Sequence, residues 1–324
     1  MKKAYLILAH QHPIHLARTI NALDDEESYF FIHVDARVNI EPFNFISNRD
    51  NVYFAKERVQ CFWGDFSIVE ATINLIKAAH EIGEIEYFIL LSGQCYPLAS
   101  NSEINAFLDR NRGTDFQNML PIEKCWSNIE VKKRLEMYRF NLGPNKYDSI
   151  HIPSLLSNDI QEPSFFENIV KLINSNDITA YEKITALRII ATPREKLNME
   201  IMGGSQWFAY TASTIHKFIN FFNSHPNFLN YFKYVHVPDE IIFPTLLAHI
   251  KSNDDSIKID KSLIYVNWTK QDVELPAILD INDFESVFEA SKFYLFARKF
   301  NPELSFELLD KIDKIRPSVL VSGR

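Results

Sequence analysis

The apolar run Tyr87-Phe88-Ile89-Leu90-Leu91 places the tightest constraint on how this chain can fold. Consecutive apolar residues without polar alternation are typical of a strand covered on both faces, as in a parallel sheet between two layers of helices. Further short strands are predicted at 4–9, 29–34 and 52–55, and apolar residues at helical spacing predict helices over 14–23 and 68–79. This alternation predicts an α/β fold.

Two polar residues directly follow the first two predicted strands. His10 ends the run 4–9, and Asp35 ends the run 29–34. In open α/β sheets, ligands bind beyond the carboxyl ends of the strands, so both residues are candidates for one nucleotide pocket. A His or Asp at a strand end also commonly serves as a local cap, and from the residues alone both interpretations stay open.

A second candidate site is the segment 236–247, in which Asp239 and Glu240 stand between Pro238 and a strongly apolar run. Pro238 fixes its own φ and disfavours helix at Val237, so Pro238-Asp239 is predicted to form the first turn of a helix with Glu240 at its start. Acidic residues there can act purely as caps, because they offset the positive end of the helix dipole. Capping and catalysis both stay open on this segment alone.

The rest of the chain is less regular. A loop is expected at 92–98, then a helix from Asn101 or Ser102 with Ser102 as a candidate cap. Between Gly113 and Gly203 helices are predicted only around 165–190, and Lys132-Lys133-Arg134 is interpreted as a solvated helix face. The pair Gly203-Gly204 indicates a close backbone approach at the start of a strand. The remaining predicted elements are a helix over 213–222, a strand over 263–268, and, after Pro302, an amphipathic helix with a frayed end.

Composition excludes several classes of function. The net charge of the 324 residues is -8 with scattered Lys and Arg, so no basic surface for nucleic acid is expected. Cys61, Cys95 and Cys125 lack the spacing of metal ligands, and their odd count favours a reducing compartment. The run Ala4–Ala9 is shorter than a secretory signal core, and no stretch approaches the ~18–20 apolar residues of a membrane span.

Several blocks of the sequence, in their order, resemble the core-2/I-branching β-1,6-N-acetylglucosaminyltransferase family, glycosyltransferase family 14, which also contains the peptide O-xylosyltransferases. The blocks are Ala4–His10, His33-Val34-Asp35, Trp63-Gly64 with Ser67–Ala71, Leu91-Ser92-Gly93 with Pro97-Leu98, Gly204-Ser205-Gln206-Trp207, Pro238-Asp239-Glu240 and Phe296–Phe300. They span nearly the whole chain.

The resemblance implies a GT-A type α/β fold with a mixed, mostly parallel central sheet flanked by helices. A single domain is expected, in which residues 1–112 form the nucleotide-sugar-binding half. Residues 113–301 would form the acceptor-binding half with the catalytic glutamate, and residues 302–324 a C-terminal helix and tail.

The resemblance also implies an inverting sugar transfer and assigns roles to residues. Glu240, after Pro-Asp, would be the general base. The residues expected at the donor are His10, Asp35, Lys299 with Arg298 beside it, and, as a looser match, Arg58. The residues expected at the acceptor are Trp207, Asp239 and Trp268.

Most GT-A enzymes hold a divalent metal with an Asp-x-Asp motif, and this sequence contains none. We therefore expect no metal cofactor, with Lys299 and Arg298 offsetting the charge of the departing UDP in its place. The alternative interpretation of these two residues is a helix face with solvated charge.

Two positions depart from the family pattern. Cys95 stands where members commonly have Asp, and Pro276-Ala277 where a basic residue commonly lies. A lost cation would weaken donor binding unless another residue substitutes. The departures keep open a catalytically weak or inactive member that binds a nucleotide sugar or a glycan. A two-carboxylate glycosidase is disfavoured, because its carboxyls must bracket a bond at ~5 Å or more and adjacent residues at a helix start point in different directions.

The predicted function is transfer of a sugar, with N-acetylglucosamine expected and xylose as the other donor type, from a UDP-sugar to a saccharide hydroxyl in bacterial surface polysaccharide synthesis. Animal relatives carry a membrane anchor, a stem and many cysteines, which this sequence lacks. A cytoplasmic protein is therefore expected, with peripheral association at the inner membrane face and a saccharide or lipid-linked saccharide as acceptor.

Overall fold

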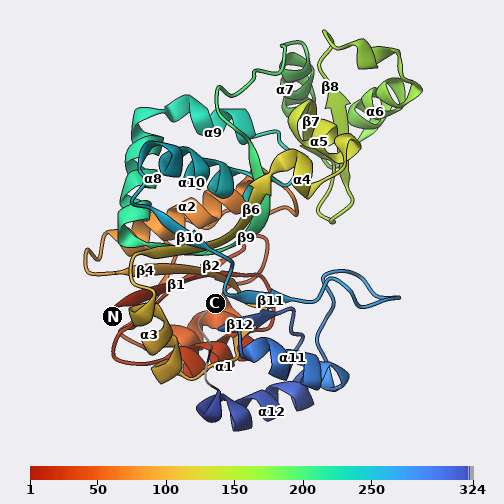
Figure 1. Ribbon diagram of the computed structural model, residues 1–324. Helices are drawn as coiled ribbons and strands as arrows, with labels where there is room; N and C mark the ends of the chain where they lie inside the picture. Colours follow the sequence, from red (N-terminus) through yellow and green to blue (C-terminus); the bar gives the residue numbers. More distant parts are fainter. Residues whose placement is uncertain (320, 322–324) are drawn as a thin grey trace.

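The computed structural model describes residues 1–319 and 321, and its centre is a seven-stranded sheet in the order β10-β6-β9-β4-β1-β2-β3 (Figure 1). The strands are β1 (Lys3–Ala9), β2 (Ser28–Val34), β3 (Val52–Phe54), β4 (Tyr87–Ser92), β6 (Thr114–Pro121), β9 (Met202–Thr211) and β10 (Lys258–Asp260). Within this sheet β9 is antiparallel to its neighbours β4 and β6, and the other pairings are parallel. The predicted α/β class with a mixed, mostly parallel central sheet is confirmed.

Helices cover both faces of this sheet, which explains why β1 and β4 are apolar along their length. Figure 1 shows α2 (Phe66–His80), α8 (Ala212–Ser224) and α10 (Ile242–Asn253) on one face, and α1 (Pro13–Leu23) and α3 (Asn101–Arg110) on the other. Tyr87, Leu90 and Leu91 of β4 are at most 1% exposed. The continuous apolar run is therefore the central, doubly covered strand that the sequence predicts.

The cap of α3 differs from the prediction. The side chain of Ser100, and not of Ser102, accepts a hydrogen bond from the backbone amide of Glu103 at 3.3 Å. Ser102 lies inside the helix, and its hydroxyl contacts that of Ser100 at 2.9 Å.

A second, three-stranded sheet joins distant parts of the chain. Its order is β11 (Ile264–Val266), β12 (Phe296–Arg298) and β5 (Cys95–Pro97), and β5 runs antiparallel to β12 with Cys95 opposite Arg298. The loop predicted at 92–98 is therefore wrong for these three residues, because a strand 200 residues later in the chain pairs with them. Helices α11 (Phe284–Ser291) and α12 (Phe306–Ile315) pack on this sheet, and the short η4 (Ile281–Asp283) contacts both helices.

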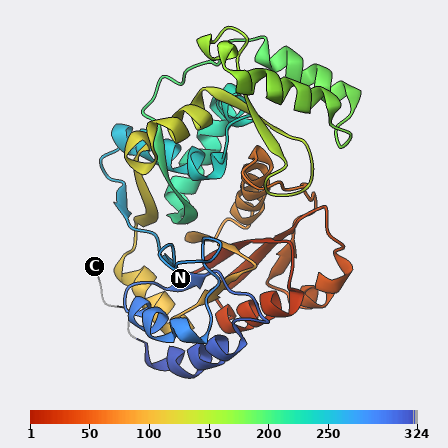
Figure 2. The ribbon, with the colours of Figure 1, turned by 90° about the vertical axis from the view of Figure 1, so that its right-hand side faces the viewer.

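The segment between β6 and β9 contains a small module with its own apolar core. It comprises the antiparallel hairpin β7 (Met137–Asn141) and β8 (Ser149–Pro153), η2 (Asn158–Gln161), α6 (Pro163–Asn174) and α7 (Ala180–Ile190). Figure 2 shows this module at the end of the molecule opposite to α12. The helices predicted around 165–190 are confirmed, whereas β6 and the hairpin lie in a stretch with no predicted strand.

The basic cluster before this module is only partly solvated. It lies on α5 (Asn128–Leu135), which follows α4 (Ile122–Cys125). The Lys132 side chain is 42% exposed, but Arg134 is only 6% exposed, and its guanidinium carbon lies 4.3 Å from the centre of the Trp126 ring. The predicted solvated face is therefore wrong for Arg134, because the planar guanidinium stacks on an aromatic ring.

The expected halves share one sheet, since β1 to β4 come from residues 1–112 and β6, β9 and β10 from residues 113–301. The amphipathic helix expected after Pro302 is α12, which buries Leu308, Leu309 and Ile312. The frayed end expected beyond it falls in part on residues 320 and 322–324, which lie outside the described residues. The remaining short elements are η1 (Glu41–Ser47), α9 (Pro226–Phe232), η3 (Pro238–Glu240) and η5 (Arg316–Ser318).

Candidate active site

A cavity of about 880 Å³ lies beyond the carboxyl ends of β1, β2 and β4. Its other walls come from β6, β9, η3, β11 and the end of β12, so both expected halves of the chain contribute to it. This is the edge at which open α/β sheets bind ligands.

The first wall, which we call the strand-end wall, consists of His10, Asp35 and Arg37. The backbone amide of Asp35 donates to the carbonyl of Ala9 at 2.8 Å, which fixes the end of β2 against the end of β1. The Asp35 carboxylate accepts hydrogen bonds from the Arg37 guanidinium at 2.8 Å, the Arg37 amide at 2.9 Å and the Cys61 amide at 3.3 Å. Burial opposes ionisation of Asp35, but these bonds outweigh it and hold its pKa below the ordinary value.

Arg58 does not line the cavity, so a direct donor contact from this residue is not supported. Its guanidinium donates to the backbone carbonyls of Val34 at 2.9 Å, Asp35 at 2.7 Å and Val38 at 2.5 Å. These bonds use the Nε and Nη2 donors of the guanidinium. Arg58 therefore fixes the segment that carries Asp35 and Arg37.

The turn that carries Glu240 has an unusual backbone. Val237 has φ 55° and ψ 56°, the left-handed region, which is costly for a β-branched residue. Its amide donates to the carbonyl of Gly64 at 2.9 Å, and a Cβ on Gly64 would lie 3.3 Å from the Val237 side chain. The prediction of a first helical turn at Pro238 is only partly correct. Residues 238–240 form a separate 3₁₀ turn, and after a break at Ile241 α10 begins at Ile242.

The second wall, which we call the carboxylate wall, consists of Asp239 and Glu240. Asp239 is 6% exposed, and its Oδ1 atom has no hydrogen-bond partner among the described residues. Burial raises the pKa of Asp239 to about 6. Burial and the neighbouring Asp239 carboxylate raise the pKa of Glu240 to about 8, although Arg134 and Arg298 act in the opposite direction. A glutamate with such a pKa is suited to exchange a proton near neutral pH.

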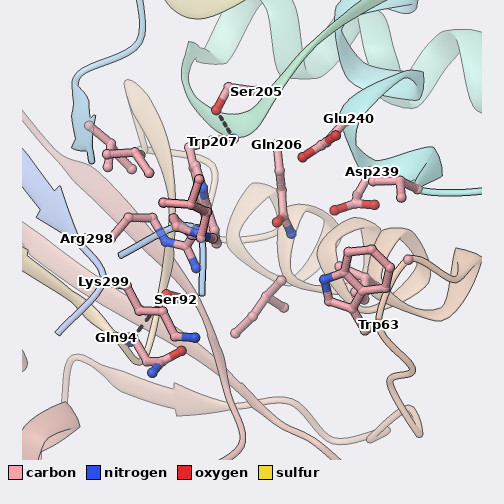
Figure 3. A pocket seen from close by; sticks show the side chains of 18 of the residues that line it. Trp63, Ser92, Gln94, Ser205, Gln206, Trp207, Asp239, Glu240, Arg298 and Lys299 are labelled. Carbon is pink, nitrogen blue, oxygen red and sulfur yellow. Dashed lines mark hydrogen bonds between the residues drawn. The ribbon is translucent and has the colours of Figure 1, made fainter. Parts of the chain in front are cut away.

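Arg298 and Lys299 lie at the end of β12 and line the same cavity. The guanidinium carbon of Arg298 is 4.4 Å from the centre of the Trp207 ring, a cation–π contact, and its Nε atom is buried without a partner among the described residues. Figure 3 shows Arg298 and Lys299 directed into the cavity from one side and Asp239 and Glu240 from the other, with Gln206 between them.

The two glycines before Trp207 allow this arrangement. A Cβ on Gly204 would lie 1.9 Å from the carbonyl oxygen of Asn118, and one on Gly203 would lie 2.2 Å from the Trp126 ring. The close approach that the sequence predicts is therefore between β9 and the irregular part of β6, where the register shifts between Gln117 and Met119.

The structure brings most of the predicted site residues together. The cavity lining includes His10, Asp35, Trp207, Asp239, Glu240, Trp268, Arg298 and Lys299. Trp268 is 56% exposed in the loop after β11. Cys95, at a position that departs from the family pattern, is fully buried, and its Sγ lies 3.4 Å from the Ser92 hydroxyl.

Sequence reasoning missed other polar and aromatic residues of the cavity, among them Arg37, Trp63, Lys146 and Glu274. Arg37 stands two residues after Asp35, so its pairing with Asp35 had a local signal. Lys146 lies in the β7–β8 loop, in a stretch with no predicted element, and nothing local placed it at the cavity.

Within residues 1–319 and 321, no three His, Cys, Asp or Glu side chains gather as metal ligands, and no helix combines the length and apolarity that crossing a bilayer requires.

Comparison with known proteins identifies the family. Residues 3–140 match the family described as Core-2/I-Branching enzyme. The match assigns residues 3–140 to this glycosyltransferase family. Xylosyltransferase 2 of Rattus norvegicus is 23% identical over 332 residues, which cover 96% of this chain and 33% of that protein. Xylosyltransferase 2 of Homo sapiens is 22% identical with the same coverage. The chain thus spans about a third of the length of these xylosyltransferases.

Among solved structures, mouse xyloside xylosyltransferase 1 in its apo form aligns over 93% of this chain and 99% of that chain. The TM-score is 0.36 and the sequence identity 11%, which is too distant to support an argument about the site.

Proposed function

We propose that this core-2/I-branching family member is an inverting glycosyltransferase that moves a sugar from a UDP-sugar to a hydroxyl of a saccharide acceptor. The observation that carries the proposal is the placement of an acid with a raised pKa, Glu240, in the same cavity as the half-buried cation Arg298 and its neighbour Lys299. Family membership supports the reaction class.

In the proposed reaction the acceptor hydroxyl loses its proton to the Glu240 carboxylate while its oxygen forms a bond to C1 of the sugar. The bond between C1 and the β-phosphate oxygen breaks on the opposite face, so the configuration at C1 inverts. The electron pair leaves with UDP, whose growing negative charge lies against Lys299 and Arg298. No bound metal takes part in this proposal.

The nucleotide would lie on the strand-end wall, with Asp35 accepting from the uracil ring and His10 beside it. Trp207, Asp239 and Trp268 would face the acceptor. Sugar rings stack well on aromatic side chains, and the exposure of Trp268 supports such a contact.

We propose N-acetylglucosamine as the donor sugar to test first. Xylose is the second, because the relatives that cover this chain are xylosyltransferases. The proposed setting is bacterial surface polysaccharide synthesis in the cytoplasm, with a saccharide or lipid-linked saccharide acceptor and peripheral contact with the inner membrane face.

A second candidate is a module that binds a nucleotide sugar or glycan without catalysis. The pKa of Glu240, raised to about 8 by burial, favours it, because a protonated glutamate at neutral pH is not a base. Cys95 and Pro276-Ala277, which depart from the family pattern, point the same way.

The test is incubation with a panel of UDP-sugars and saccharide acceptors, with mass spectrometry of the products and calorimetry of binding. Transfer with inverted C1 configuration supports the enzyme. Tight UDP-sugar binding without hydrolysis or transfer at pH 7 and pH 9 supports the binding module.

A further inference from the structure

The cations that line the cavity are not equally available to a diphosphate. In the described part of the chain they are Arg37, Lys146, Arg298 and Lys299. Arg37 is engaged by the Asp35 carboxylate at 2.8 Å, and the half-buried Arg298 guanidinium lies over the Trp207 ring, 4.4 Å from its centre. A sugar diphosphate carries a negative charge on each phosphate and gains more as it leaves, so more than one available cation is expected.

Lys146 reaches the cavity from the loop between β7 and β8. Its Nζ atom lies 2.6 Å from the Glu274 carboxylate and 5.0 Å from the centre of the Trp63 ring. The Glu274 side chain is 68% exposed and that of Lys146 is 30% exposed. Because water screens such a pair, the bond to Glu274 is weak and exchangeable.

The loop that carries Lys146 is tied to the proposed nucleotide site. The Arg37 guanidinium donates to the carbonyl of Pro144 at 3.0 Å while it also holds Asp35. A nucleotide on the strand-end wall would therefore lie beside this loop.

Lys146, Glu274 and Lys299 form one electrostatic cluster. Burial lowers the pKa of Lys299, the charges of Arg298 and Lys146 lower it further, and Glu274 raises it. The Glu274 carboxylate thus balances the charges of Lys146 and Lys299, a role that the phosphates of a bound donor would also fill.

We propose that Lys146 is a second available cation for the donor diphosphate, held by Glu274 until the donor binds. The inference rests on the proposed function. Lys146 would supply the basic side chain that the segment Pro276-Ala277 lacks.

The experiment compares UDP and uridine binding by calorimetry in the wild type, Lys146→Met, Lys146→Arg and Glu274→Gln. Lys146→Met is expected to weaken UDP binding about tenfold, because a charge-assisted contact is lost, and to leave uridine binding unchanged. Lys146→Arg retains the charge and should restore most of the UDP affinity. Glu274→Gln removes the competing carboxylate, so its UDP affinity should equal or exceed that of the wild type.

The control is Lys132→Met, which breaks a similar pair, with Asp159 at 2.7 Å, outside the cavity and should change neither affinity. If Lys146→Met and Glu274→Gln weaken UDP and uridine alike, the pair only ties two loops together and the inference is wrong. Unchanged UDP binding in Lys146→Met also overturns it. A wild type that binds UDP no better than uridine contradicts the proposed function itself, and the inference with it.

Discussion

The two walls of the cavity differ in the hydrogen bonding and the pKa values of their carboxylates. On the strand-end wall the Asp35 carboxylate has three hydrogen-bonding groups around it and a pKa below its ordinary value. On the carboxylate wall Asp239 Oδ1 has no partner among the described residues, and burial raises the pKa values of Asp239 and Glu240 to about 6 and about 8.

This difference separates two tasks. Nearly all buried polar groups in proteins are hydrogen-bonded, so a satisfied carboxylate such as Asp35 is compatible with a rigid binding surface. Carboxylates with raised pKa values and unmet partners cost stability and tend to occur where chemistry takes place. We therefore expect substitutions on the strand-end wall to change binding, and substitutions on the carboxylate wall to change rate, pH dependence and stability.

The largest effect is expected for Glu240→Gln. Amide nitrogen and oxygen keep the shape but cannot accept the proton, so transfer should fall by at least ~100-fold, the usual contribution of a general base. UDP binding should stay within about twofold of the wild type, since in the proposed reaction the diphosphate would lie against Lys299 and Arg298 and not against Glu240. Steady-state kinetics and calorimetry measure the two quantities.

The control for Glu240→Gln is the exposed Glu123, whose change to Gln should leave both quantities unchanged. Wild-type turnover in Glu240→Gln would show that this residue is not the general base. The carboxylate wall would then have no separate role in the chemical step.

A smaller effect, on binding, is expected for Asp35→Asn. A hydrogen bond to a charged group contributes about 1.5–3 kcal/mol, so affinity for both UDP and uridine should fall about tenfold or more. The rate at saturating donor should change less, because in the proposed binding mode Asp35 would contact the uracil ring and not the reacting atoms. Exposed Asp50 provides the matched Asp→Asn control. A rate loss at saturation as large as the loss of affinity would show that the walls are not separate.

The pH dependence of the rate tests the carboxylate wall without a mutation. Because the pKa of Glu240 is raised to about 8, the base is mostly protonated at pH 7, and kcat should rise with pH through that value. The expected gain between pH 7 and pH 9 is about tenfold, from the fraction ionised. A flat profile over this range would show that burial does not hold Glu240 protonated.

The sequence predicted the strand-end wall better than its surroundings. β1, β2 and β4 are marked by local apolar runs, and residues after such runs fall at the ligand edge, which is how His10 and Asp35 were found. The three residues of β5 carry no strand pattern and become a strand only because β12 pairs with them. Lys146 reaches the cavity through the fold of the hairpin module, which no local pattern reports.

The carboxylate wall was found from residue type and not from geometry. Asp239 and Glu240 stood out because charge is unusual beside an apolar run, and the family pattern added the role of Glu240. The left-handed Val237 and its bond to Gly64 are tertiary features, since the partners lie far apart in the chain. The raised pKa values arise from burial that only the folded chain produces.

A stability effect of a few degrees is expected for Glu240→Gln. The folded-state pKa of about 8 lies above the ordinary 4.5, so the folded state binds more protons between these values. Stability from this group is therefore present below pH 4.5 and is lost as pH rises through about 8. Gln does not ionise, so the variant should melt several degrees higher than the wild type at pH 8. The difference should shrink toward pH 5. A variant that melts lower than the wild type at pH 8 would show that ionisation of Glu240 does not destabilise the folded state.

The smallest expected effect is that of a chelator, and it bears on the face between the two walls, where the leaving UDP would lie. If Lys299 and Arg298 offset the charge of UDP, the rate with excess EDTA should stay within about twofold of the untreated rate, because their ammonium and guanidinium groups replace a metal ion. Loss of activity that manganese restores would show that a metal ion, and not these two side chains, offsets the charge of UDP.

Lys299→Met discriminates further. If the Lys299 side chain lies at the diphosphate, this substitution should weaken UDP binding and leave uridine binding unchanged. Unaltered UDP affinity would remove Lys299 from the donor site. Either contrary result would leave the roles of the strand-end wall and the carboxylate wall unchanged, but a different group would then offset the charge of the departing UDP.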